Sequence, residues 1–223
     1  MLLAFRSIST LQVIKNDKSL KMEQQIERAN EAFDLFMEDK IDEGVAHVTG
    51  PELAYSIYHN YARVSILVFK ALIAFNQEDF AIAIEASDAC LALCNETIRE
   101  TWLEQISGSF SDEKYKSWSD EKFHTMLVRA ETLFYKTALL ACSSGADLMA
   151  IAKICVYSRD SYKLFEKCLD IVDIRPWSSP LLREEFINGT KFGLGMFKVR
   201  LDTYHFRRVF ITLEFDQGNL TYK

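Results

Sequence analysis

The chain has 223 residues, of which 49% are hydrophobic and 26% are charged, the composition of a globular protein rather than a disordered one. Only 8 residues are Gly and 3 are Pro, which is too few for the frequent tight turns of β-sandwiches, barrels and Rossmann sheets. The net charge of −6 argues against a general nucleic-acid binder. We therefore expect an all-α protein without a nucleic-acid partner.

The first 20 residues form a leader that precedes the regular pattern. It carries Arg6 and Lys15 and has no acidic residue before Asp17. This composition fits a weak mitochondrial targeting segment, a frayed leader or an alternative start of translation, and all three remain open.

Residues 21–103 are predicted to form two helical hairpins. Apolar residues recur every three or four positions over residues 22–37 and again over 41–48.

The second of these hairpins is expected to begin at the sequence Thr49-Gly50-Pro51, where Gly is typical of a helix end and Pro of a helix start. A long apolar helix is predicted from there to Phe75, and a further helix over residues 79–101. Residues 104–119 are predicted to be a loop. Ser119 is the expected N-cap of a helix over residues 120–142.

Residues 120–175 make the third predicted hairpin, with a turn near residues 145–147. Pro176 and Pro180 bracket a connector, and residues 176–223 form a last helical region that we expect Gly189, Gly193 and Gly195 to interrupt.

Helices that alternate with short turns favour stacked antiparallel hairpins of the tetratricopeptide type. In the hairpin over residues 58–101, Ala71 sits where such a repeat places a small residue at the helix crossing. Ala83 is expected to face it, and Phe80 and Ile84 supply the aromatic and aliphatic packing positions. A weaker copy of the pattern covers residues 32–48, at a spacing longer than the standard repeat. The sequence therefore predicts a degenerate tetratricopeptide-like α-solenoid.

Four strings add a family resemblance to this periodicity. They are AFDLFMEDKIDEGVAHV from Ala32, YHNYARVSILVFKALIAFNQEDFAIAIEASDACLALCN from Tyr58, AETLFYKTALL from Ala130 and FINGTKFGLGMFKVRLDTYHFRRVFITLEF from Phe186. In order and spacing the chain resembles the N-terminal half of the tetratricopeptide repeat protein 39 family, which includes the fungal inclusion body clearance proteins. The resemblance implies an adaptor role in protein quality control or in lipid-linked regulation. Family members are more than twice as long, so a short isoform, a divergent paralogue and an incomplete gene model all remain open.

The residue types that usually carry chemistry form no recognisable catalytic or metal-binding motif. The four histidines, at positions 47, 59, 124 and 205, are scattered and are interpreted as packing or surface residues. Cys90 and Cys94 share a helix face and are interpreted as a core pair, and all five cysteines as reduced core thiols. The glycines of the last region are interpreted as points of close helix approach rather than a phosphate loop. We expect no enzyme activity, cofactor or metal.

Charge asymmetry is the feature with functional content. Residues 23–43 hold eight acidic against two basic residues, whereas residues 191–210 hold five basic residues against Asp202 alone. The latter set is either a solvated, internally paired face or a contact surface for an acidic partner or an anionic membrane. Its members are Lys191, Lys198, Arg200, Arg207 and Arg208.

The function predicted from the sequence is a non-enzymatic, cytoplasmic scaffold that binds unidentified protein partners. The alternative is a peripheral protein on the surface of mitochondria or another organelle, attached through the basic helix or the leader. An exposed apolar patch is also expected near the C-terminal end, edged by Arg207 and Arg208, and it could support self-association.

Overall fold

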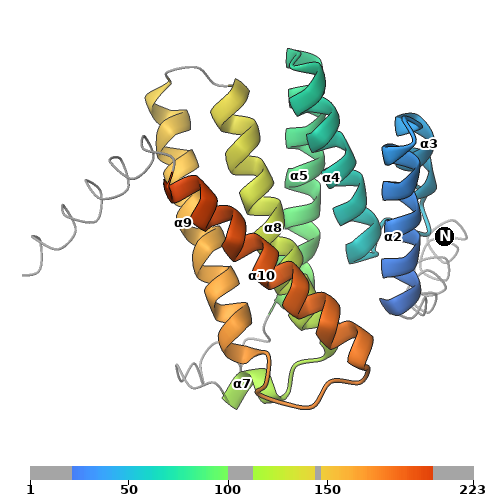
Figure 1. The fold of residues 1–223 in the computed structure, drawn as a ribbon, viewed down its shortest axis with the longest axis vertical. Helices are drawn as coiled ribbons and strands as arrows, with labels where there is room; N and C mark the ends of the chain where they lie inside the picture. Colours follow the sequence, from blue (N-terminus) through green and yellow to red (C-terminus); the bar gives the residue numbers. More distant parts are fainter. Residues whose placement is uncertain (1–21, 100–112, 144–146, 203–223) are drawn as a thin grey trace, which may run out of the picture.

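The computed structural model describes residues 22–99, 113–143 and 147–202, and the regular structure in these ranges is entirely helical (Figure 1). The prediction of an all-α fold is confirmed. The helices are α2 (Met22–Met37), α3 (Ile41–His47), α4 (Ile57–Ala74), α5 (Gln77–Ile98), α7 (Glu113–Lys116), α8 (Asp120–Ser143), α9 (Leu148–Ile171) and α10 (Pro180–Asp202).

Antiparallel hairpins stack side by side to build the molecule. Helices α2 and α3, α4 and α5, and α8 and α9 are packed pairs, and each pair contacts the next. Helix α2 packs on α4, α4 packs on α8, and α10 crosses α8 and α9 obliquely (Figure 1). The first helices of successive hairpins therefore form one continuous surface, which we call the first-helix face: α2, α4, α8 and α10. This is the stacking of a tetratricopeptide-like α-solenoid.

Local side chains set where several helices begin and end. Asp39 adopts a positive φ of 65° and stops α2. The Asn76 side chain accepts a hydrogen bond from the backbone N–H of Asp79 at 2.9 Å at the start of α5. The predicted cap at Ser119 is confirmed, because its hydroxyl accepts the backbone N–H of Lys122 at 3.3 Å.

Two predicted boundaries are wrong. Residues 51–55 form turns and α4 begins only at Ile57, because the Asn60 amide donates to the carbonyls of Ala54 (3.0 Å) and Ser56 (2.9 Å) and holds that turn. The predicted loop 104–119 contains the short helix α7, and both Tyr115 and Trp118 are buried there. The free energy gained by burying these two rings favours ordered structure here, although the surrounding residues are polar.

The expected glycine breaks in α10 are absent, since the helix runs unbroken from Pro180 to Asp202. A Cβ atom added at Gly193 would lie 2.3 Å from the Phe165 ring, and one at Gly189 would lie 2.9 Å from a Leu127 methyl. At these two positions glycine lets α10 approach α8 and α9 closely, which confirms that interpretation. Gly195 differs, because nothing lies within 4 Å of its Cβ position.

The core has two clusters, one between α2, α4, α5 and α8 and one between α8, α9 and α10. Ala71, Ala83 and Phe80 are buried in the first cluster, and Ile84 is half-buried against it. The direct pairing of Ala71 with Ala83 stays a prediction. Gly44 also lets two helices approach closely, here α3 and α2, because its Cβ position lies 2.8 Å from the Ala32 carbonyl oxygen.

The cysteines divide between the core and the surface. Cys90, Cys94 and Cys168 are buried, as the sequence predicted. The same prediction is wrong for Cys142, which is exposed near the end of α8, and for Cys155, which is half-buried in α9. Both lie near helix surfaces that no other described element covers completely, so an apolar neighbourhood in the sequence did not ensure burial.

Candidate protein-binding surface

A row of aromatic rings crosses the first-helix face from one hairpin to the next. Phe36 of α2 and Phe69 of α4 have ring centroids 6.0 Å apart, and Phe69 lies 6.1 Å from Tyr135 of α8. Tyr61 of α4 stacks on Tyr135 at 6.2 Å. These rings are half-buried or, at Phe69, 39% exposed. The row is therefore packed from below and open to solvent from above, as in a pre-formed apolar binding surface.

The row continues toward α10 through Phe134, whose ring lies 5.2 Å from that of Phe197. Phe197 is buried, whereas Phe192 is 65% exposed and Met196 is 39% exposed on the same helix. Only part of the apolar side chains of α10 is thus covered within the described residues. Leu201 of the predicted C-terminal patch belongs to α10, but its side chain is not described. The remaining apolar residues of that patch lie outside the described residues, as do Arg207 and Arg208 at its edge.

Glu131 of α8 is the polar centre of this face. Its Oε1 atom lies 3.3 Å from the Cβ position of Gly189, so α10 passes directly over the carboxyl group. Burial raises the pKa of Glu131 to about 8, although a hydrogen bond with Tyr61 acts in the opposite direction. Burial also raises the pKa of Tyr58, with the nearby carboxylates of Glu131 and Glu185 adding to the effect. Within the described ranges Glu131 forms no ion pair.

Two buried histidines lie deeper in the same region. His124 is hydrogen-bonded through Nδ1 to the Tyr58 hydroxyl and is surrounded by Trp177 and Phe186. The Nδ1 atom of His59 lies 2.5 Å from the Ser56 hydroxyl. Burial lowers the pKa of each imidazole to about 4, so both are neutral at physiological pH. The interpretation as packing residues is confirmed for these two.

Of the remaining two histidines, the structure describes one. His47 is on the surface, where its Nε2 lies 2.8 Å from a Glu31 carboxylate oxygen. His205 lies outside the described residues. Among the residues that the structure describes, no group of His, Cys, Asp and Glu is arranged to hold a metal ion.

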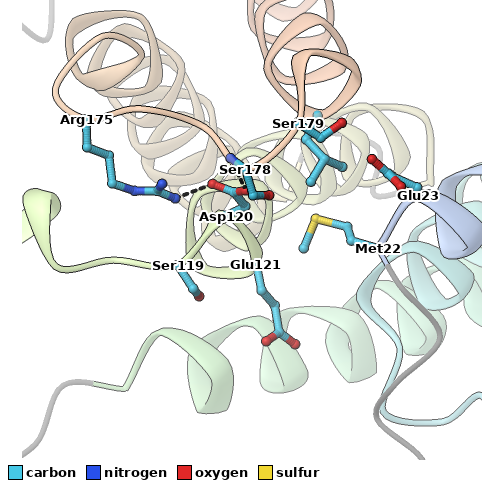
Figure 2. A pocket seen from close by; sticks show the side chains of 9 residues that line it. Met22, Glu23, Ser119, Asp120, Glu121, Arg175, Ser178 and Ser179 are labelled. Carbon is cyan, nitrogen blue, oxygen red and sulfur yellow. Dashed lines mark hydrogen bonds and ion pairs between the residues drawn. The ribbon is translucent and has the colours of Figure 1, made fainter.

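A pocket of about 620 Å³ lies at one end of the first-helix face (Figure 2). The starts of α2, α8 and α10 converge on it, so carboxylates and hydroxyls lie beside the partial positive charges of helix N-termini. Its walls combine an apolar pair with polar side chains. The lining residues are Met22, Glu23, Ser119, Asp120, Glu121, Arg175, Ser178, Ser179 and Leu182.

Asp120 joins α8 to the connector that leads into α10. Its carboxylate pairs with the Arg175 guanidinium and accepts the Ser178 hydroxyl and the Ser178 backbone N–H, the last at 3.1 Å (Figure 2). Burial alone would raise the pKa of Asp120, but the hydrogen bonds from Ser178 and Arg175 outweigh it and hold the pKa below its usual value. We call this arrangement the Asp120 clasp. Sequence reasoning missed it, because its partners lie more than 50 residues apart.

The predicted basic contact residues are only partly placed by the structure. Lys191 is exposed on α10. Lys198 and Arg200 belong to the same helix, but their side chains are outside the description, as are Arg207 and Arg208 entirely. The basic contact surface thus stays a prediction. None of the described helices is long and apolar enough to cross a membrane.

Comparison with known proteins decides the family. The family model Iml2/Tetratricopeptide repeat protein 39 matches residues 30–202, which is most of the chain and runs from α2 to the end of α10. The chain belongs to the Iml2/Tetratricopeptide repeat protein 39 family. The resemblance noted in the sequence is thereby confirmed.

The chain was also compared with a curated tetratricopeptide repeat protein, which shows how much of each sequence matches. Tetratricopeptide repeat protein ttc-39B of Caenorhabditis elegans is 27% identical over 188 residues. The match covers 82% of this chain and 32% of the worm protein, so the chain spans about a third of the length of that relative. No solved structure matches the chain. Family membership agrees with the helical-repeat architecture described above.

Proposed function

We propose that this protein is a non-enzymatic adaptor that binds a segment of a partner protein on its first-helix face. The observation that carries the proposal is the aromatic row from Phe36 through Phe69 to Tyr135. Three hairpins contribute to it, its rings support one another, and it remains open to solvent. Aromatic side chains that are rigidly held but accessible supply large contact area at low entropic cost, as binding hot spots do.

The family supports a finer proposal. An adaptor of the Iml2/Tetratricopeptide repeat protein 39 family would act in protein quality control, such as inclusion body clearance, or in lipid-related regulation, and it would work in the cytoplasm. The resemblance of the strings around Tyr58 and Phe186 to that family supports this role. The helical-repeat architecture supports the interaction function itself.

The second candidate is a peripheral protein on an organelle surface, with the mitochondrial surface as the first case to test. The exposed Lys191 on α10 and the basic composition of residues 191–210 favour it. Cell fractionation of the full chain and of a chain lacking residues 1–20 separates the two candidates. Co-sedimentation of the full chain with organelles, lost on deletion, would assign the attachment to the leader. Retention after deletion would assign it to the basic helix.

Site-specific photo-crosslinking tests the adaptor proposal. A benzoylphenylalanine is placed at Phe69 on the first-helix face and, as the control, at Ile82 of α5. The two side chains are 39% and 40% exposed, so they differ in location rather than accessibility. We expect discrete protein adducts in cells from position 69 and none of the same size from position 82. Equal adducts at both positions, or none at position 69, would contradict the proposal.

A further inference from the structure

Three large apolar side chains are exposed where α2 and α4 end. Met37 is the last residue of α2, Ile73 lies in the last turn of α4, and Phe75 follows α4 directly. Their exposed fractions are 79%, 74% and 65%. The ring of Phe36 lies 6.0 Å from that of Phe69 just before these positions, so the two helix ends lie side by side. We call Met37, Ile73 and Phe75 the end patch.

The backbone at Phe75 adds to the evidence that this surface is used. Phe75 has a left-handed conformation with φ of 52°, in which α4 ends. Gly or Asn usually occupies such a position, because bulky side chains rarely adopt it. The Phe75 ring contacts Phe80 edge-on at 5.5 Å and is otherwise mostly exposed. The chain therefore holds an aromatic ring at the surface in a conformation that disfavours it.

Unpaired carboxylates border the end patch. Asp34 lies one turn before Met37 on the surface of α2, and Asp39 follows the end of that helix. Both are exposed and form no ion pair with a described residue. The nearby lysines are already paired with other carboxylates, so the end patch is apolar and negatively charged. The two pairs are Lys40 with Glu38 at 2.7 Å and Lys70 with Asp79 at 3.4 Å.

Helix α10 presents a second exposed apolar surface. Phe192, Gly195 and Met196 share one face of the helix, because they are spaced by three and four residues from Phe192. Phe192 and Met196 are exposed, and Lys191 beside them is exposed without an ion pair to a described residue. Residues 191–202 carry three basic residues and one acidic residue. We call Lys191, Phe192, Gly195 and Met196 the α10 stripe, which is apolar and positively charged.

Gly195 lies at the centre of this stripe. A glycine inside a helix destabilises it relative to alanine. Gly189 and Gly193 let α10 approach its neighbours, whereas nothing lies within 4 Å of the Cβ position of Gly195. Because it lacks a side chain, Gly195 leaves room for another molecule to come close to the helix backbone between Phe192 and Met196.

We propose that the chain associates head to tail, with the α10 stripe of one copy bound to the end patch of another copy. The ammonium group of Lys191 lies against the carboxylates of Asp34 and Asp39, and the apolar side chains of the two surfaces pack together. This inference goes beyond the proposed adaptor function and concerns different side chains from the aromatic row.

The complementary charges select a second copy and this pairing of its surfaces. Two end patches in contact would bring carboxylates together, and two α10 stripes would bring ammonium groups together, so both symmetric pairings are disfavoured. The two surfaces of one copy are on opposite sides of the stack (Figure 1). Helix α10 approaches α2 near Met22, at the other end of α2 from Met37. The contact therefore forms between copies, and further copies can add at the free surfaces.

The test uses two double variants of the full chain, each of which blocks one surface. Asp34→Lys with Met37→Lys blocks the end patch, and Lys191→Glu with Phe192→Glu blocks the α10 stripe. All four positions are exposed, so circular dichroism should show an unchanged fold. Sedimentation equilibrium over a range of concentrations measures the mean mass of each variant and of the wild-type chain.

A third double variant is the matched control. Ile82→Lys with Glu85→Lys replaces one apolar and one acidic residue on α5, at the same three-residue spacing as in the end-patch variant. Both positions are exposed, and they lie on a second helix of a hairpin, outside the two proposed surfaces. The control therefore makes the same change in charge and hydrophobicity without touching the contact.

We expect the mean mass of the wild-type chain and of the control to rise with concentration. Each blocked variant alone should associate at least about tenfold more weakly, which corresponds to about 1.4 kcal/mol. An equimolar mixture of the two blocked variants should form a dimer and nothing larger, because each variant keeps the surface that the other has lost.

Several results would overturn the inference. They are a wild-type chain that stays monomeric up to about 1 mM, a control that loses association as the blocked variants do, a blocked variant that still associates with itself, and a mixture that stays monomeric. The adaptor proposal is decided separately by the crosslinks at Phe69. Adducts there with a different protein, from a chain that is monomeric, would support the adaptor proposal and overturn only the head-to-tail contact.

Discussion

Glycines two residues apart in α10 have opposite consequences for stability. Gly193→Ala would place a methyl group in the buried Phe165 ring, which cannot move away, and should destabilise the fold by about 1–3 kcal/mol. Gly195→Ala meets no neighbour and should stabilise by about 0.5–1 kcal/mol, because alanine favours the helix. Urea denaturation of both variants measures this. Equal shifts of the two midpoints would show that α10 does not pack on Phe165 as described.

Ala71 tests the packing of the second hairpin. It is fully buried in α4 within the cluster that includes Ala83 and Phe80 of α5. Ala71→Leu should overpack this contact and cost about 1–3 kcal/mol in the free energy of unfolding. Ile73→Ala, at a largely exposed position two residues later, is the control and should change little. An unchanged denaturant midpoint for Ala71→Leu would mean that the predicted helix crossing is misplaced.

His124 makes stability depend on pH. Its pKa is about 4 in the folded chain and near 6.5 when exposed, so between these values the unfolded state binds more protons. Stability should therefore fall as the pH drops from 6.5 to 4, by at most about 3 kcal/mol for this group. His124→Gln should flatten that part of the pH profile, whereas the surface change His47→Gln should not. Identical profiles for wild type and His124→Gln, measured by urea denaturation, would contradict the burial of a neutral imidazole.

At the scale of elements, the Asp120 clasp fixes the connector between α9 and α10. Asp120→Ala removes the carboxylate that holds Ser178 and leaves the Arg175 guanidinium without its partner. We expect a loss of about 2–4 kcal/mol. Hydrogen exchange should increase over residues 174–182. Glu121→Ala, one residue later and exposed, is the control. If exchange in this connector does not change in Asp120→Ala, the clasp is not what positions α10.

The helices themselves were largely predictable from sequence because they depend on local signals. Apolar periodicity located α2, α5, α8 and α9, and the Ser119 cap was visible in the sequence. The continuity of α10 was not, because the effect of Gly193 depends on the Phe165 ring of another helix. Local sequence rules predict a helix break at a glycine, whereas Gly193 lies inside an unbroken helix and allows α10 to pack closely on Phe165.

The candidate site was less predictable for the same reason. Glu131 lies where α4, α8 and α10 meet, and the Asp120 clasp joins the start of α8 to a connector more than 50 residues away. These separations in the sequence carry no periodic signal. In the sequence, the rings of the aromatic row occupy ordinary helix positions, and no motif marks them as neighbours. Nothing local distinguishes Phe69 and Tyr135, which meet across two hairpins, from rings that are simply buried. The family resemblance, by contrast, identified the family because it depends on whole strings.

At the scale of the whole molecule, helix α10 links the two ends of the stack of described helices. It contacts α2 as well as α8 and α9, and Leu182 of α10 belongs to the core cluster formed mainly by α2, α4 and α5. A linear repeat array has contacts only between neighbours, so it can fray from either end independently. Here the first and last described helices share buried contacts.

This closure has a consequence for how the chain folds. Ends that hold each other should melt together, so unfolding should be one cooperative transition, and the long-range contact should slow folding relative to an open array. Leu182→Ala should raise hydrogen exchange not only in α10 but also in the distant α2. Exposed Leu181→Ala is its control. If the change stays within α8, α9 and α10, the ends fold independently. If it reaches α2, the described helices behave as a closed loop in which α10 stabilises α2.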